Sequence, residues 1–443
     1  MFDRKTITRI ILLFIGALIA ATALSFLTFS VRAPGFHARI AENITTLSAR
    51  SQFYPSVLFG RNFSRLDNYT DALMTQLSMD NPARTIAQQA LQPLMVVAFF
   101  DEVRELPNQV QSLEARYYQG IEPTYEYGRY WHGYRTPLRI LGSIFSYQQL
   151  RVVNYLCLSV LFAIAGHSIY QLFDEVVLFF YAVSLFAASI YLVPLSLQFL
   201  SVFYILFVSN IALCITLLRK GEDAPILEIV ALSAMATAFF DLLTAPLIIV
   251  GFLAVIYGMW LYRTQERDEG IIARSLAGIY GLWFFVYGAF WAAKSLIASL
   301  FGVSGVGSSM ANQVVKFITD ASVTDWLNAI PYNVATFMGA SSLDANVRDV
   351  YYWLYVVGFF VFVALSVIVW LIFLEKKQGK LDLAVAKPYL PMLGIAISPF
   401  IWWQLMGWHS ANHPFVYREI AVFIFGLAMF YRLVYEQVHV ETH

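Results

Sequence analysis

The chain has few charged residues. Only 13% of its 443 residues are Asp, Glu, Lys or Arg, and positive and negative charges cancel to a formal net charge of zero. Soluble domains typically carry about 25% charged residues. The deficit excludes an ordinary soluble domain, and the zero balance provides no overall field that would attract nucleic acid or an acidic partner.

Cysteine and the signatures of several enzyme classes are also scarce. The two cysteines, Cys157 and Cys214, lie inside apolar runs, so we expect neither a disulfide nor a cysteine-based metal site. The sequence contains no P-loop, no H-E-x-x-H and no G-x-S-x-G. These absences disfavour ATP-driven work and hydrolysis from a nucleophile elbow. No segment repeats at a fixed period, and no separate soluble domain is expected.

Hydrophobic residues take the place of charge. They make up 59% of the chain, with a mean hydropathy of +0.63. Runs of about 20 apolar residues, the length that crosses a bilayer core, recur along the sequence. The first covers 10–29 and follows Arg4, Lys5 and Arg9. No convincing cleavage site follows it, so we expect an uncleaved first span.

Nine more apolar runs predict an all-α, polytopic transmembrane helical bundle of about ten spans. They lie at 150–172, 176–195, 197–218, 225–240, 243–262, 275–299, 351–374, 388–406 and 419–434. We expect a single transmembrane domain over 1–434, with the first span at 10–29, an extracytoplasmic loop with interfacial helices at 30–149, the remaining spans at 150–434, and a cytoplasmic tail at 435–443.

The placement of basic residues predicts the orientation. Short loops on one side carry bases, namely Arg219, Lys220, Arg263, Arg274, Lys376 and Lys377. Because cytoplasmic loops retain Lys and Arg, both termini are expected in the cytoplasm. The hairpin at Asp174 and Glu175 is the exception, since it is acidic where the rule requires bases.

The long loop contains two acidic residues four positions apart, Asp67 and Asp71. On a helix they share one face, and nearby carboxylates shift each other's pKa so that one can serve as a base. Alternatively, Asp67 or Asn68 caps a helix that begins near Tyr69, with Asp71 in its first turn. The two interpretations are compatible with each other.

The remainder of this loop predicts further helices. The segment 86–100 is apolar but only about four turns long, which suits a helix that lies along the interface or re-enters it. The segments 107–116 and 138–147 also have helical character. We therefore expect several interfacial helices at the mouth of the bundle.

A second polar segment, EPTYEYGRYWHGY, contains Glu126, Arg129, Tyr130, Trp131 and His132. Anchoring at the membrane interface accounts for its Tyr and Trp residues. It does not account for an Arg and a His among them. Aromatic faces stack on sugars and Arg binds phosphate through two parallel hydrogen bonds, so the segment suits a glycosylated or phosphorylated lipid.

Three more polar features fall on the predicted outer face. One is Asp241, near a span end, and another is GWHSANHPFVYR, with His409, His413 and Arg418. The charged loop from 301 to 350 is a third.

The two histidines have the spacing of a metal-ligand pair, but Pro414 argues against a continuous helix and no acidic partner is evident. Phosphate binding by Arg418 with histidine help is the favoured interpretation. The alternative is a set of interfacial residues that cap the last span.

Four segments, DNYTDALM, EYGRYWHGY, FDLLTAPL and NHPFVYR, resemble those of bacterial polytopic membrane proteins near the GT-C superfamily of membrane glycosyltransferases. The overall layout is also similar to that superfamily. The resemblance implies a sugar donor linked to polyprenyl phosphate or diphosphate, and a catalytic base in the first outer loop. In this chain the acids follow the first span by about 38 residues, which leaves the base open among Asp67, Asp71 and Glu126.

The resemblance therefore implies an inverting, polyprenyl-phosphate-sugar-dependent glycosyltransferase of the bacterial plasma membrane, acting on a cell-envelope glycan or lipid in polysaccharide biosynthesis. The expected base is Asp67 or Asp71; the expected donor phosphate ligands are Arg129, His132, His409, His413 and Arg418; the other expected substrate contacts are Glu126, Tyr130, Trp131 and Asp241. No cofactor is required by these residues, although a divalent metal would be compatible with them. The alternatives are a transporter or flippase of lipid-linked saccharides, a non-catalytic assembly protein, and a polysaccharide polymerase.

Overall fold

The computed structural model describes residues 3–49, 53–98, 100–101, 106–264, 269–319, 322–340, 350–378 and 382–441. Within these residues the chain is helical apart from four two-residue strands. Strand β1 (Leu94–Met95) pairs antiparallel with β4 (Tyr125–Glu126), and β2 (Phe100–Asp101) pairs with β3 (Leu106–Pro107). The predicted all-α class is confirmed.

A helix lies at each of the ten predicted apolar runs. They are α1 (Arg4–Ser30), α7 (Tyr147–Leu172), α8 (Glu175–Ala187), α9 (Leu197–Lys220), α10 (Ile226–Phe240), α11 (Leu247–Thr264), α12 (Glu269–Leu300), α15 (Val350–Gln378), α16 (Leu390–Leu405) and α18 (Ile420–Glu441). Among the described residues, seven helical segments are long and apolar enough to cross a membrane, those containing α1, α7, α9, α11, α12, α15 and α16. The chain is thus a multi-pass membrane protein, and ten spans remain a prediction.

The predicted run at 176–195 is not one continuous helix. Helix α8 ends at Ala187, Ser189 adopts a φ of 56°, and the 3-10 helix η2 (Ile190–Leu195) follows. Pro194 lies inside this second piece and has no backbone N–H to continue an α-helical ladder. At 1.5 Å per residue α8 is about 20 Å long, which is shorter than a ~30 Å hydrocarbon core.

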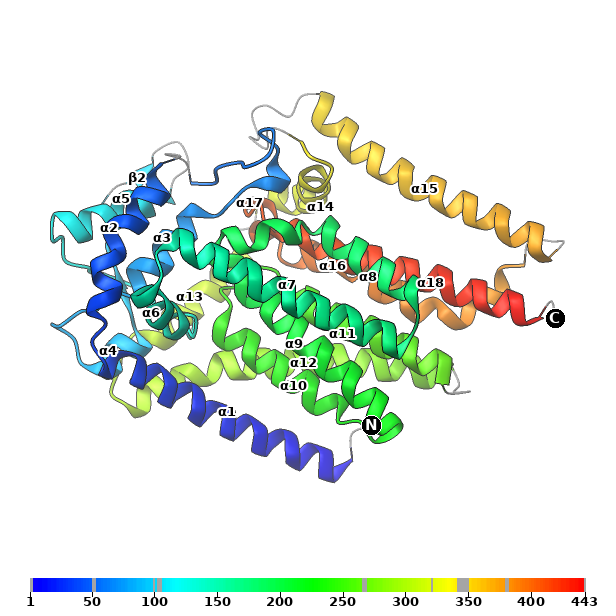
Figure 1. Cartoon of the computed structure of the whole chain (residues 1–443), viewed down its shortest axis with the longest axis horizontal. Helices are drawn as coiled ribbons and strands as arrows, with labels where there is room; N and C mark the ends of the chain where they lie inside the picture. The colour runs from blue at the N-terminus through cyan, green and yellow to red at the C-terminus, as the bar shows by residue number, and fades with distance from the viewer. Residues whose placement is uncertain are drawn as a thin grey trace.

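Helix α11 forms the centre of the bundle. In its most apolar 18-residue stretch, 83% of the residues are buried, and it packs against α9, α12, α16 and α18. Gly251 allows the close approach to α18, because a Cβ there would lie 2.5 Å from the side chain of Val422. Small residues commonly permit such contacts between membrane helices. Helices α1 and α15 lie at the periphery, with 17% and 11% of the residues in their most apolar stretches buried (Figure 1).

Both termini lie at one end of the bundle, and the first loop lies at the other (Figure 1). At the terminal end Asp174, in the α7–α8 hairpin, pairs with Arg263 at 2.8 Å and with Arg432 at 3.6 Å. These bases from α11 and α18 neutralise the hairpin that departs from the predicted charge pattern. The orientation of this end toward the cytoplasm remains a prediction.

The first loop folds into a helical cap, as predicted. Its helices are α2 (Pro34–Ser48), η1 (Asn62–Ser64), α3 (Asn68–Leu77), α4 (Ile86–Leu91), α5 (Gln109–Tyr118) and α6 (Arg135–Ile144). The predicted helix at 86–100 is wrong beyond Leu91. Gln92 leaves the helical region, since the proline that follows disfavours helical backbone at the preceding residue.

Later segments complete the cap. They are α13 (Val306–Thr319), α14 (Val323–Phe337), α17 (Gly407–Asn412) and η6 (Val416–Glu419). Helix α14 packs against η1, α17 and η6, and thereby joins the first loop to the segment before α18. Two short 3-10 helices, η3 (Gly221–Asp223) and η5 (Leu383–Tyr389), lie in the other connections.

Candidate functional site

Asp67 is the N-cap of α3, which confirms the capping interpretation. Its Oδ1 accepts a hydrogen bond from the Thr70 amide, and its Oδ2 accepts one from the Thr70 hydroxyl, both at 2.8 Å. The side chain is 1% exposed. Burial raises the pKa of Asp67 to about 7, with a further contribution from the negative charge of Asp71, while Arg418 acts in the opposite direction. An acid with such a pKa can exchange a proton near neutral pH.

Asp71, one turn later, is engaged on all sides. Its carboxylate accepts hydrogen bonds from the hydroxyls of Tyr147 and Ser196 and from the amides of Leu197 and Gln198. The two amides belong to the first turn of α9, so Asp71 caps that helix from outside. This arrangement suits a residue that fixes α3 to the bundle, and it leaves little room for a substrate hydroxyl.

Arg418 is a buried cation with unused donors. Its side chain is 1% exposed, and its guanidinium lies over the Phe199 ring, 4.0 Å from the centroid. Among the described residues it makes one hydrogen bond, a long one from Nη1 to the Phe415 carbonyl at 3.4 Å. Nε and Nη2 have no hydrogen-bond partner among the described residues. Burial lowers the pKa of Arg418, and Asp67 opposes this effect without forming a direct ion pair.

Glu419, which sequence analysis missed, lies beside this arginine. It is fully buried, and Oε1 accepts a hydrogen bond from the Leu247 amide at the start of α11, at 3.4 Å. The indole of Trp403 is a further hydrogen-bond partner of this carboxylate. Burial raises the pKa of Glu419 well above its usual value, and the charge of Asp241 adds to the effect. Its only sequence signal is an acid between Arg418 and an apolar run.

Asp241 organises the turn between α10 and α11. Its carboxylate accepts hydrogen bonds from the Thr244 amide at 2.8 Å and the Ser201 hydroxyl at 3.3 Å. Leu243, inside the turn, has a φ of 67°, which is unusual for a bulky residue. His409 donates from Nε2 to the Leu243 carbonyl at 2.9 Å. Asp241 and His409 together hold a strained backbone of the kind that often accompanies functional sites.

The two histidines lie close together but not on one helix, because α17 ends at Asn412. The ring centroids of His409 and His413 are 4.5 Å apart, and His413 stacks on Phe415. Burial lowers the pKa of His409 to about 4, so this ring is neutral at physiological pH. Within the described residues no group of three or more His, Cys, Asp or Glu side chains is arranged to hold a metal ion.

Helix α12 fixes the segment from Gly128 to Trp131. Lys294, fully buried, donates to the carbonyls of Gly128, at 2.6 Å, and Tyr130. Trp291 donates to the Arg129 carbonyl at 2.7 Å. Trp131 donates in turn to a carbonyl of α12 and is completely buried. Trp131 therefore anchors the segment, and the structure does not present its ring to a sugar.

His132 and Gly133 complete this anchorage. The ring of His132 donates from Nε2 to the Tyr127 carbonyl at 2.8 Å and accepts at Nδ1 from the Tyr134 hydroxyl at 3.2 Å. Burial lowers its pKa well below the usual value, and a neutral, fully engaged imidazole is poorly suited to phosphate. Gly133 lies against Phe239, where a Cβ would approach the ring to 2.3 Å.

Arg129 is the side chain that this rigid segment presents. It is half-buried, donates to the Tyr127 hydroxyl at 2.8 Å, and lies over the Tyr127 and Tyr130 rings. Tyr69, two residues after Asp67, interacts electrostatically with both Arg129 and Asp67. Asp67 thus interacts electrostatically with Tyr69 and Arg418, and Tyr69 also interacts with Arg129. Arg129 and Arg418 both pack against aromatic rings.

Glu126 does not belong to this group. It is exposed on β4, it interacts electrostatically with Arg84, and its Oε2 lies 2.7 Å from the Cβ position of Gly305. Of the three candidate bases, Asp67 alone combines burial, a raised pKa and incomplete engagement of its oxygens.

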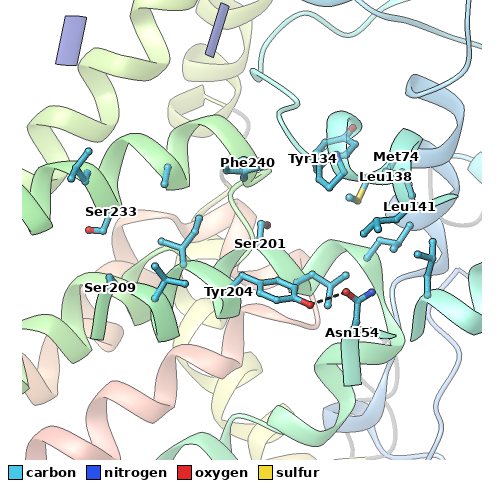
Figure 2. Close-up of a pocket in the computed structure, with 18 of the residues that line it drawn as sticks. Met74, Tyr134, Leu138, Leu141, Asn154, Ser201, Tyr204, Ser209, Ser233 and Phe240 are labelled. Carbon is cyan, nitrogen blue, oxygen red and sulfur yellow. Dashed lines mark hydrogen bonds between the residues drawn. The ribbon is translucent and has the colours of Figure 1, made fainter. Parts of the chain in front are cut away.

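A cavity of about 730 Å³ lies between α7, α9 and α10 (Figure 2). None of the eleven predicted site residues lines it. It approaches them at the loop end through Met74, on α3, and through Ser201, which donates to Asp241. The predicted residues and the large cavity are therefore neighbours and not one pocket.

Comparison with protein-family models, curated proteins and solved structures gives no match. The resemblance to GT-C glycosyltransferases remains an expectation from short segments and layout.

Proposed function

We propose that this chain is an inverting, GT-C-type membrane glycosyltransferase. It would move a sugar from a polyprenyl-phosphate-linked donor to a cell-envelope glycan or lipid acceptor on the outer face of the bacterial plasma membrane. The proposal rests on one observation: a buried acid with a pKa of about 7, Asp67, interacts electrostatically with a buried arginine, Arg418, whose Nε and Nη2 have no partner in the described structure.

The chemistry needs no covalent enzyme intermediate, because phosphate is already a good leaving group. Asp67 takes the proton of the acceptor hydroxyl, the acceptor oxygen bonds to the anomeric carbon, and the bond from that carbon to the phosphate oxygen breaks. The electron pair leaves with the polyprenyl phosphate. Attack opposite the leaving group inverts the anomeric centre.

The cations stabilise the charge that develops on the leaving phosphate. Arg418 has two nitrogen donors to offer, and its burial strengthens each hydrogen bond to an anion. Arg129 is a second donor on the rigid segment fixed by α12. Asp67 and Arg418 form no direct ion pair, and the proposal places the reacting groups of the substrate between them. Asp241 and Tyr130 are proposed substrate contacts on the same side of the bundle.

The test is a transfer assay on purified protein in nanodiscs, with polyprenyl-phosphate-linked sugars as donors. Mass spectrometry of the lipid that copurifies with the protein provides an independent readout. Transfer with inversion, together with a bound polyprenyl-phosphate species, is the expected result. Movement of the intact lipid-linked saccharide between leaflets without bond cleavage would support the alternative below.

One observation favours a second candidate, a transporter or flippase of lipid-linked saccharides. The large cavity is lined by none of the proposed acid–base or phosphate-binding residues and extends along α9 at membrane depth. A translocation path needs such a lateral, apolar surface. A scramblase assay with the same donors separates this function from sugar transfer.

A further inference from the structure

The cavity beside α9 extends over most of the thickness of a bilayer's hydrocarbon core. Helix α9 packs against both α7 and α10, and its lining residues follow one helical face from Leu197 to Ala212. At 1.5 Å per residue this face is about 22 Å long, against a hydrocarbon core of ~30 Å. The volume of about 730 Å³ falls in the range of small-ligand sites. Helices α7 and α9 are both candidate spans, which places the cavity at hydrocarbon depth.

The lining is apolar apart from a few hydroxyls and the amide of Asn154. No lining residue is charged. Ser209 and Ser233 donate to backbone carbonyls of their own helices, at 3.1 and 2.8 Å. Tyr204 donates to Asn154 at 2.9 Å (Figure 2), and Ser201 donates to the carboxylate that caps α10. Since the hydroxyl donors are already used within the protein, the chemistry of the lining fits a hydrocarbon chain.

The cap borders the cavity at its loop end, and some lining residues at its side are exposed. Met74, Tyr134 and Leu138 from the cap border its loop end (Figure 2). Val208 on α9 and Leu232 on α10, both lining residues, are 56% and 44% exposed. A chain can therefore enter laterally from the membrane.

We propose that this cavity seats one acyl chain of a bilayer phospholipid. The cavity does not select the headgroup, because the α6 arginines near the loop end already bind other groups of the protein. Arg135 donates to the carbonyls of α4, and Arg139 pairs with Asp80 at 2.8 Å. A cavity that recognises a chain and no headgroup takes its occupant from the bulk lipid. This inference does not depend on sugar transfer.

The experiment uses the full chain in nanodiscs of phosphatidylethanolamine and phosphatidylglycerol. A trace of phospholipid with a diazirine on one acyl chain is included, and after irradiation the labelled peptides are identified by mass spectrometry. We expect label on 200–212 and 229–236 at several times the level, per residue, of the exposed face of α15. Equal labelling of the cavity and of α15 would overturn the proposal.

Matched variants assign the label to the cavity. Ala236→Trp fills it from α10, whereas Ala163→Trp places the same ring on the exposed side of α7. We expect the first variant to remove the excess label and the second to retain it. Where Ala236→Trp does not fold, Ala212→Phe fills the cavity from α9. Displacement of the label by added polyprenyl phosphate would also overturn the proposal, by showing that the cavity prefers the prenyl chain.

Discussion

Two segments at the cap end of the bundle differ in how fully their buried polar side chains are hydrogen-bonded. In Tyr127–Arg135 the buried polar groups are engaged, except for Nε of Arg129. Arg135 alone donates to three carbonyls, those of His132, Gln89 and Ala90. In His409–Glu419, Arg418 is buried with two donors, Nε and Nη2, that have no partner in the described structure.

The difference separates scaffold from site. A buried polar group without a partner costs about 1–3 kcal/mol, so folded proteins retain few of them. The first segment is arranged to be rigid and to present Arg129. The second retains a cation that a bound anion would satisfy. The acids on α3 show the same contrast, since Asp71 is saturated by the start of α9 and Asp67 is only partly engaged.

The largest expected effect comes from replacing the two acids. Asn caps helices as well as Asp does, so Asp67→Asn should retain α3 and the fold. It should reduce transfer by about 10²–10⁴-fold, because the base is lost. Asp71→Asn should instead lower the unfolding temperature, because an amide cannot accept from every donor around Asp71. Both are measured as initial transfer rates and as thermal unfolding in detergent.

The reverse result would contradict the comparison. An Asp67→Asn protein with full activity, beside a stable but inactive Asp71→Asn protein, would move the base to Asp71. Loss of activity in neither variant would remove both acids from the mechanism.

The next effect contrasts two buried arginines. Arg418→Gln should reduce transfer by about 10²–10³-fold, with a higher donor KM, because a phosphate ligand is lost. It should lose less stability than Arg135→Gln, since within the described residues the guanidinium makes one long hydrogen bond and a cation–π contact with Phe199. Arg135→Gln should lose about 1–3 kcal/mol of stability, because carbonyls in α4 lose their donors. Equal destabilisation in both variants would make Arg418 structural.

Sequence periodicity predicted where the helices lie, because apolar runs near span length leave few alternatives. It also predicted the α3 cap, since Asp before a helical pattern has a local physical reason. It failed where the chain breaks helices within apolar runs. The run at 176–195 ends its α-helix at Ala187, and the predicted helix at 86–100 ends at Leu91. Pro194 and Pro93 were the available signals.

The site was less predictable because its properties are tertiary. Nothing near Asp71 in the sequence indicates that its partners come from residues 196–198. Glu419 and Lys294 are lone charges beside or within apolar runs, and only the packing shows that both are fully buried. Spacing identified Asp67 and Arg418, but their electrostatic interaction required coordinates.

The third prediction concerns pH. Since Asp67 acts as a base when ionised, and burial raises its pKa to about 7, transfer should rise about tenfold per pH unit below 7 and level off above it. The stability effect has the opposite direction. The raised pKa means that the folded state favours protonated Asp67. The contribution of Asp67 to the free energy of unfolding therefore falls as pH rises from about 4 to 7. Asp67→Asn should remove this component from unfolding measured across that range.

A smaller effect tests the rigidity of the Tyr127–Arg135 segment. Gly133→Ala places a Cβ about 2.3 Å from the Phe239 ring, so the segment must shift. We expect a loss of about 1–3 kcal/mol and reduced transfer, as Arg129 is displaced. Gly281→Ala, in α12 with open space around its Cβ position, is the matched control and should be neutral or slightly stabilising. Thermal unfolding and transfer rates are compared for the pair.

The smallest effect is expected at the opposite end of the bundle. Arg432 pairs with Glu436 at 2.6 Å and with Asp174 at 3.6 Å, and these side chains are about a quarter exposed. Ion pairs of this kind contribute about 0–1 kcal/mol, so Arg432→Gln should shift the unfolding temperature slightly and leave transfer unchanged. The shift should shrink further at high salt, which screens exposed pairs. A large loss of transfer would show that the terminal end affects the cap, and the separation of scaffold from site would then fail.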